Sequence, residues 1–145
     1  MRKALSAGSQ RAIVAALAIV ILVGLGYWLL APRLPGAAAA ELEGKTWQLT
    51  ALNSQPPAPG SRVTLTFKDG KVGGNSGVNQ FGGSYRASAG SVTLSGIAST
   101  MMASTDPALN QQEQAVLNIL QGQLIYRVSG NQLELSSPAG TLLFQ

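Results

Sequence analysis

Two different patterns of apolar residues divide the chain near residue 41. The segment 12–31, AIVAALAIVILVGLGYWLLA, runs for twenty residues without a charged side chain. As a helix it would span about 30 Å, the thickness of the hydrocarbon core of a bilayer. From residue 41 onward apolar and polar residues alternate in short runs, which is typical of half-buried β-strands. The pattern therefore predicts one transmembrane helix followed by one small β-rich domain.

Alternation and turn residues predict eight strands in this second region. The predicted strands are 45–52, 63–67, 71–75, 80–87, 91–97, 124–129, 132–136 and 141–144. Asp69-Gly70 and Gly130-Asn131 are typical hairpin turns, and the three prolines of 54–60 predict a surface loop. The glycine-rich 72–77 lacks the Gly-Lys-[Ser/Thr] ending of a phosphate-binding loop, so it is interpreted as a bulged strand and tight turn.

One helix is predicted between the fifth and sixth strands. Asp106 is a good N-cap, Pro107 suits the first helical position, and Gly122 ends the helix. The apolar stripe at helical spacing consists of Leu109, Val116, Leu117 and Leu120. Five strands, one helix and three strands predict an α+β fold, a small antiparallel, barrel-like sheet with this amphipathic helix packed on its concave face.

The net charge of +4 lies in the first forty residues. Arg2, Lys3 and Arg11 precede the apolar segment and only Arg33 follows it, whereas residues 41–145 carry six basic and six acidic side chains. The positive-inside rule therefore predicts a cytoplasmic N-terminus, residues 1–11, and an extracytoplasmic or periplasmic domain. A domain without surplus cations is not expected to bind nucleic acid.

The expected location is the inner membrane, crossed once. Tyr27 and Trp28 are expected at the membrane interface, where aromatic rings are favoured, and residues 32–40 are expected to form a short Pro/Ala linker. The alternative is a signal peptide cleaved after Ala40. A retained anchor is preferred, because the apolar run is long for a signal peptide and this site lies about nine residues beyond it.

The sequence offers no constellation of catalytic residues. It has no cysteine and no histidine, which excludes thiolate or imidazole zinc sites, cysteine nucleophiles and histidine-based triads. We therefore expect no enzymatic activity, no cofactor and no metal.

Glu113 is the most interesting carboxylate, because its position on the helix places it beside the apolar stripe. A buried acid with a shifted pKa is one interpretation. A structural pairing with Arg86, Arg127 or backbone N–H groups is the preferred one. Of Met101 and Met102, at least one is expected to pack in the core, with a soft apolar contact surface as the alternative.

Several short motifs in this order resemble the META-domain, or HslJ-like, family. They are the opening strand around Trp47, a glycine-rich signature, a T-x-M-A segment, and the helix with its closing hairpin. The residues that carry the resemblance are Trp47, Gly74, Gly77, Asn79, Phe81, Gly83, Tyr85, Thr100, Met102 and Glu113. The resemblance covers residues 42–144.

The resemblance implies an extracytoplasmic protein linked to envelope stress, antibiotic tolerance, secretion or motility, without enzymatic activity. The family commonly has cysteines where this chain has Val78 and Ser104, so any function of such a pair is absent. We therefore expect a membrane-anchored binding or structural domain of the cell envelope, its protein partner unidentified. The alternatives are an accessory subunit of a membrane complex and a carrier of a small apolar ligand.

Overall fold

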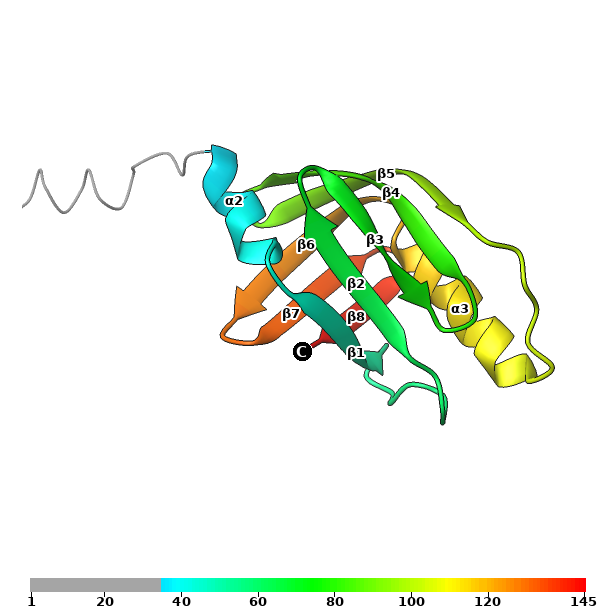
Figure 1. Ribbon diagram of the computed structural model, residues 1–145. Coiled ribbons are helices and arrows are strands. Elements are labelled where there is room, and N and C mark those ends of the chain that lie inside the picture. Colours follow the sequence, from blue (N-terminus) through cyan, green and yellow to red (C-terminus); the bar gives the residue numbers. More distant parts are fainter. Residues whose placement is uncertain (1–34) are drawn as a thin grey trace, which may run out of the picture. The chain divides into compact units, whose positions relative to one another are not determined.

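Eight antiparallel strands close into a barrel in the computed structural model, which describes residues 35–145 (Figure 1). The strands are β1 (Thr46–Leu52), β2 (Val63–Lys68), β3 (Lys71–Ser76), β4 (Gln80–Ser88), β5 (Ser91–Ser99), β6 (Gly122–Ser129), β7 (Gln132–Ser137) and β8 (Gly140–Phe144). Within residues 35–145 two helices accompany them, α2 (Pro35–Leu42) and α3 (Pro107–Ile119). Each strand pairs with its neighbours in sequence, and β1 also pairs with β8.

The eight strands and α3 confirm the elements predicted from the sequence. In β2, for example, Val63, Leu65 and Phe67 are buried while the two threonines between them are half-buried. The predicted barrel-like sheet is a fully closed barrel, because β8 lies antiparallel to β1 with Phe144 opposite Leu49. Beyond this register the backbones of Gln48 and Gln145 exchange two hydrogen bonds, of 2.7 and 2.9 Å. The first and last strands thus complete a closed barrel.

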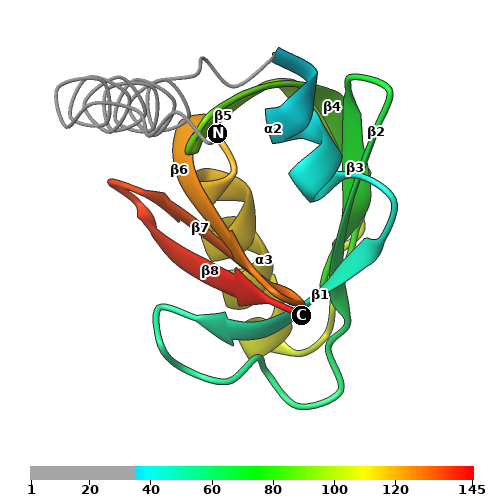
Figure 2. The ribbon, with the colours of Figure 1, turned by 90° about the vertical axis from the view of Figure 1, so that its left-hand side faces the viewer.

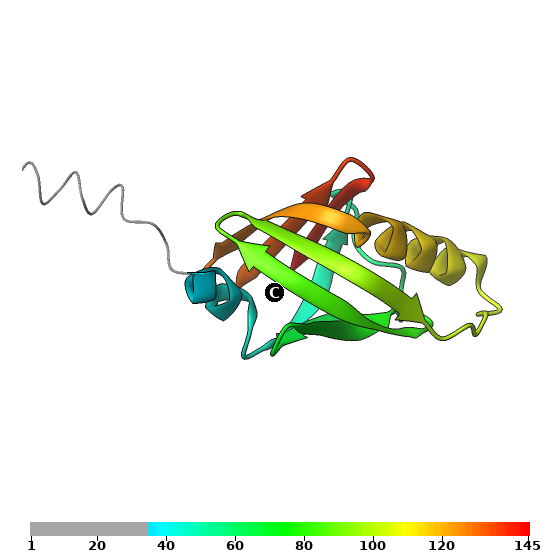
Figure 3. The same ribbon diagram turned by 90° about the horizontal axis from the view of Figure 1, so that it is seen from above.

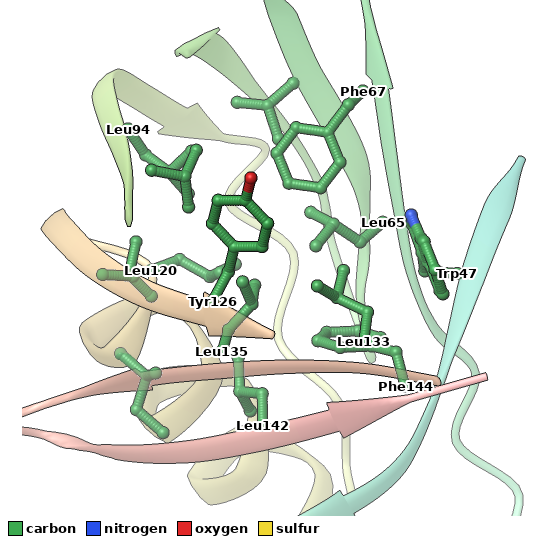
Figure 4. Close-up of a cluster of buried hydrophobic side chains, with 14 of the residues drawn as sticks. Trp47, Leu65, Phe67, Leu94, Leu120, Tyr126, Leu133, Leu135, Leu142 and Phe144 are labelled. Atoms are coloured by element: carbon green, nitrogen blue, oxygen red, sulfur yellow. The ribbon is translucent and has the colours of Figure 1, made fainter. Parts of the chain in front are cut away.

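Side chains fill the interior of the barrel (Figure 4). Those labelled in the figure are all buried, and they are Trp47, Leu65, Phe67, Leu94, Leu120, Tyr126, Leu133, Leu135, Leu142 and Phe144. Phe67 meets Tyr85 edge to face, with 5.0 Å between ring centroids and 77° between planes, a favourable arrangement for aromatic rings. Burial of this apolar surface is the main force that holds the domain together, because the chain has no cysteine for a disulfide.

The helix α3 lies across one end of the barrel, which corrects the predicted packing on a concave sheet face (Figures 1 and 3). As predicted, Asp106 caps it by accepting a hydrogen bond from the N–H of Ala108 at 2.9 Å, and Pro107 occupies the first turn. Val116 and Ile119 reach the core from this helix. Because the strands already fill the concave surface with their own side chains, the place left for the helix is the open end.

The helix α2 lies at the opposite end and was not predicted (Figures 1 and 2). It occupies residues 35–40 of the expected linker, so that interpretation is wrong for this part. Ala38 and Leu42, one helical turn apart, are buried against the barrel, with 4% and 0% of their surface exposed. Alanine has the highest helix propensity, and burial of these two side chains fixes the helix in place.

The predicted N-terminal features lie outside the described residues. These are the cytoplasmic tail 1–11, the membrane span 12–31 with Tyr27 and Trp28, and positions 32–34 of the linker. Within residues 35–145, neither helix has the length and apolar character needed to cross a bilayer.

Candidate functional site

A cluster of polar contacts around three buried side chains, those of Ser76, Asn79 and Glu113, joins three segments at the α3 end of the barrel. Its members are Ser76 at the end of β3, Asn79 in the turn before β4, Thr100 and Met102 after β5, and Glu113 on α3. We call these five residues the Asn79 cluster. Four of them carry the family resemblance found in the sequence, so the structure brings these distant motifs together.

The turn between β3 and β4 prepares the cluster. Gly77 has a φ of +116°, a conformation that side chains rarely adopt. Its N–H donates to the side-chain oxygen of Asn75 at 2.8 Å. This tight turn brings the backbones of Ser76 and Asn79 together, and the N–H of Ser76 donates to the carbonyl of Asn79 at 2.8 Å.

Glu113 is buried, with only 8% of its surface exposed. Its Oε1 accepts hydrogen bonds from the hydroxyl of Ser76 and, at 2.8 Å, from the backbone N–H of Asn79. Its Oε2 accepts a bond from Nδ2 of Asn79, also at 2.8 Å. Both carboxylate oxygens are therefore engaged, as a buried charge requires.

The side chain of Asn79 uses its full hydrogen-bonding capacity. Its Oδ1 accepts from the hydroxyl of Thr100 at 2.8 Å and from the N–H of Met102 at 2.7 Å. Its Nδ2 donates to the carbonyl of Met102 and to Glu113, each at 2.8 Å. One amide thus fixes the backbone of Met102 from both sides and links it to α3.

These contacts set the pKa of Glu113. Burial alone would raise it, because a carboxylate loses hydration inside the protein. The hydrogen bonds donated by Ser76 and Asn79 favour the charged form and outweigh burial, so the pKa of Glu113 lies below its ordinary value. At neutral pH the side chain is an anion that accepts hydrogen bonds and has no proton to give.

The arrangement supports the structural interpretation of Glu113. Within residues 35–145 its carboxylate accepts hydrogen bonds from neutral donors of Ser76 and Asn79 and from the backbone of Val78, so neither predicted arginine, Arg86 or Arg127, is used. The predicted pairing with backbone N–H groups is found at Asn79. A carboxylate with both oxygens occupied holds α3 against the barrel and offers little capacity for acid–base chemistry.

A second polar contact at this end was missed in the sequence. Gln112 is buried, and its side-chain oxygen accepts from the N–H of Ala58 at 2.6 Å while its Nε2 donates to Ser61 at 3.0 Å. The loop between β1 and β2 is thereby fastened to α3. The signal was present, because Leu109, Gln112, Glu113 and Val116 recur at helical spacing and share one face. For Ser76, by contrast, no local spacing in the sequence indicated its contact with Glu113.

The remaining family residues shape the barrel. Trp47, Phe81 and Tyr85 are core side chains. Gly74 lies against β2, where a Cβ atom would stand 1.9 Å from the carbonyl oxygen of Thr64. A Cβ on Gly83 would come within 2.8 Å of the backbone of β5. These glycines allow neighbouring strands to approach, which agrees with the non-phosphate interpretation of the glycine-rich segment.

Met101 and Met102 correct the prediction that at least one of them packs in the core. Both side chains face solvent, with 98% and 64% of their surface exposed. The reason lies in the backbone, because residues 100–106 run outside the barrel between β5 and α3 and Asn79 binds the main chain of Met102. The alternative, an apolar surface, is what the structure presents.

Polar tips of core aromatics fasten α2 at the other end. The indole N–H of Trp47 donates to the carbonyl of Leu42 at 2.9 Å, and the hydroxyl of Tyr126 lies 3.3 Å from the carbonyl of Ala38. The hydroxyl of Tyr85 donates to Glu43. Burial, followed by the hydrogen bond to Glu43 and the negative charge of that carboxylate, raises the pKa of Tyr85 well above its usual range.

A surface hollow of about 940 Å³ forms an open groove beside α2. Its lining includes the charged side chains of Glu43, Lys45, Lys68 and Asp69. Lys45 also lies over the ring of Trp47, 4.0 Å from the ring centroid, in a cation–π contact. A mixture of both charge signs in an open groove is poorly suited to an apolar ligand.

The fold and its polar contacts define a small closed β-barrel domain with a helix at each end. The chain belongs to the META domain family, which matches residues 40–145, and the resemblance seen in the sequence is thereby confirmed.

Two solved structures are similar to this chain. One NMR structure has a TM-score of 0.64 and 24% identity, over 74% of this chain and 92% of its own, and shows the shared fold alone. The NMR structure of a protein from Burkholderia xenovorans has a TM-score of 0.60 and 28% identity, over 79% and 88% of the two chains. No curated protein matches the sequence.

Proposed function

We propose that this chain is a non-enzymatic META domain protein of the cell envelope, held at the outer face of the inner membrane by its N-terminal segment. Its barrel would serve as a binding or structural domain in envelope stress or antibiotic tolerance, the roles that the family resemblance implied. The observation that carries the proposal is the state of Glu113. The strongest candidate for a catalytic acid in the sequence is an anion held by Ser76 and Asn79. The part of the domain that remains available for a function is therefore its surface, which can bind other molecules.

The charge distribution and α2 support a retained anchor. An uncharged segment of twenty residues with basic residues before it favours a span with the domain outside. Cleavage after Ala40 would remove most of α2, including Ala38, which is buried and lies within reach of the Tyr126 hydroxyl. Retention keeps the folded domain whole.

Cysteine labelling tests the topology, because any introduced cysteine becomes the only thiol in the chain. Ser129→Cys places it on an exposed hairpin of the barrel, and Ser6→Cys places it in the N-terminal tail. In spheroplasts, a membrane-impermeant maleimide should label the first variant at once and the second only after lysis. Equal labelling of both, or the reverse order, would contradict the proposal.

The mass of the membrane-bound protein tests retention separately. We expect the full chain to remain in the pellet after alkaline carbonate extraction and to keep its first forty residues. A product beginning at Glu41 would show that the segment is a cleaved signal peptide, while leaving the extracytoplasmic location intact.

The second candidate is an accessory subunit of a membrane complex, and the exposed apolar pair Met101 and Met102 favours it. The filled barrel interior argues against the third alternative, the carrier of an apolar ligand. Photo-crosslinking in native membranes, with probes at Met101, in 54–60 and at Tyr27, separates the first two. One dominant protein adduct would support the subunit, whereas lipid adducts or none would support a free-standing envelope domain.

A further inference from the structure

All the sulfur of the described domain lies at one place on its surface. The chain has no cysteine and three methionines, of which Met101 and Met102 fall within residues 35–145. Their side chains are 98% and 64% exposed. A methionine thioether reacts with oxidants to the extent that its sulfur is accessible, so both residues stand open to such reagents.

The other readily oxidised side chains of the domain are protected. Trp47, Tyr85 and Tyr126 are its tryptophan and tyrosines, and their exposed fractions are 0%, 5% and 3%. The chain has no histidine. Within residues 35–145 the contrast is therefore sharp, because the two thioethers face water while every aromatic of this kind is enclosed.

The backbone beneath the two thioethers is held without them. Asn79 binds both the N–H and the carbonyl of Met102, at 2.7 and 2.8 Å. Thr100 donates its N–H to the carbonyl of Gln80 at 2.9 Å. Because these contacts use main-chain atoms and the side chains lie in solvent, a chemical change at either sulfur leaves the barrel and the Asn79 cluster in place.

We propose that Met101 and Met102 form a surface oxidation site for two-electron oxidants such as hydroperoxides and hypohalous acids. With hydrogen peroxide, the sulfur donates an electron pair to one peroxide oxygen, the O–O bond breaks, and an S=O bond forms. The thioether loses two electrons, the peroxide is reduced to water, and proton transfer balances the step. Each methionine becomes a sulfoxide, which a methionine sulfoxide reductase converts back.

The modification changes the surface and not the fold. A sulfoxide is polar and accepts hydrogen bonds, so the exposed apolar pair becomes a hydrophilic one. Met101 is the more exposed of the two and reacts first.

Peptide mapping by mass spectrometry tests the proposal on the full-length protein treated with dilute hydrogen peroxide at neutral pH. A blocked methionine dipeptide in the same tube supplies the rate of a free thioether. We expect Met101 to react within about threefold of that rate and ahead of Met102. Met1 and Trp28 fall in other peptides and are scored apart. In urea the two methionines should react at equal rates, which shows that their order comes from the fold.

Met101→Leu and Met102→Leu serve as matched variants, since leucine keeps the apolar volume and removes the sulfur. On peroxide treatment each single variant should gain one oxygen atom fewer than the native protein. In the double variant, residues 35–145 should gain none. The circular dichroism spectrum and the urea midpoint of the oxidised protein should equal those of the untreated one. Protection of Met101 by more than about tenfold, oxidation of Trp47 at a similar rate, or unfolding on oxidation would each overturn the proposal.

Discussion

Asn79 holds Glu113 by two hydrogen bonds of equal length, one from its backbone N–H to Oε1 and one from its side chain to Oε2, both 2.8 Å. A residue in a turn between strands thereby binds both oxygens of a carboxylate on a helix that is 34 positions away in the sequence. The same amide group also fixes the chain that leads into the helix, at Met102. Turn, connecting segment and helix are thus positioned by one pair of side chains.

Glu113→Gln should destabilise the domain. The substitution removes the charge and sets an NH2 group against donors from Ser76 and Asn79, so at least one buried hydrogen bond is lost. We expect the free energy of unfolding to fall by about 2–3 kcal/mol, measured by urea denaturation of the full-length protein with circular dichroism. Gln114→Ala is the control, since Gln114 lies on the exposed side of the same helix. An unchanged midpoint combined with lost function would instead make Glu113 a functional acid.

Acid should weaken the domain through the same carboxylate. The pKa of Glu113 is lower in the folded protein than its ordinary value of 4.5, so the folded state favours the charged form. The resulting stability is complete above that ordinary pKa and is lost as pH falls through the lower, folded-state pKa. Urea midpoints measured from pH 6 downward should therefore decline below about pH 4.5. In Glu113→Gln the decline should be shallower, and an identical pH profile would exclude Glu113 as its source.

Gly74→Ala should be far more harmful than Gly82→Ala, although both glycines lie in adjacent strands. A Cβ on Gly74 would meet the Thr64 carbonyl oxygen at 1.9 Å, whereas a Cβ on Gly82 meets nothing nearer than 3.8 Å. Overpacking against backbone should cost Gly74→Ala about 3 kcal/mol or more, with Gly82→Ala within about 1 kcal/mol of the native protein. Thermal unfolding of the two variants compares them directly. Equal melting temperatures would show that β2 and β3 can separate without cost.

Ala38→Glu and Ala40→Glu test whether α2 belongs to the folded domain. Both substitutions place the same charge on the same helix, but Ala38 is 4% exposed whereas Ala40 faces solvent. A charge buried at position 38 should lower the free energy of unfolding by at least about 2 kcal/mol, and position 40 should be nearly neutral. Urea denaturation gives both values. If neither variant differs from the native protein, residues 35–40 behave as the linker expected from the sequence.

Local sequence patterns predicted the strands and α3. They did not predict the closure of the barrel or the helix α2, because both depend on contacts between residues that are far apart in the sequence. The alternation of β2 and the cap at Asp106 are properties of a few consecutive residues. The pairing of Leu49 with Phe144 joins the first and last strands of the domain. Closure of the barrel therefore cannot be recognised from any short stretch of the sequence. The alanines around Ala38 are too small to mark an amphipathic helix, and their burial depends on the aromatics that receive them.

The Asn79 cluster was likewise predicted only where local spacing decides. The helical position of Glu113 predicted that it lies beside the packed stripe, because helical spacing involves only neighbouring residues. Its partners were not foreseen, because Asn79 and Ser76 come from a turn whose placement depends on the whole barrel. The exposure of Met101 was misjudged because hydrophobicity favours burial on average, while the path of this backbone segment is fixed by the hydrogen bonds of Asn79.

Closure of the barrel determines how this domain can meet other molecules. Within residues 35–145 each strand has a bonded neighbour on both sides over at least part of its length, so no strand offers a whole row of unpaired N–H and C=O groups as a template. Recognition by addition of a foreign strand, and the edge-to-edge growth that leads to fibrils, both need such a row. A partner must therefore bind to side chains, loops or the two capped ends.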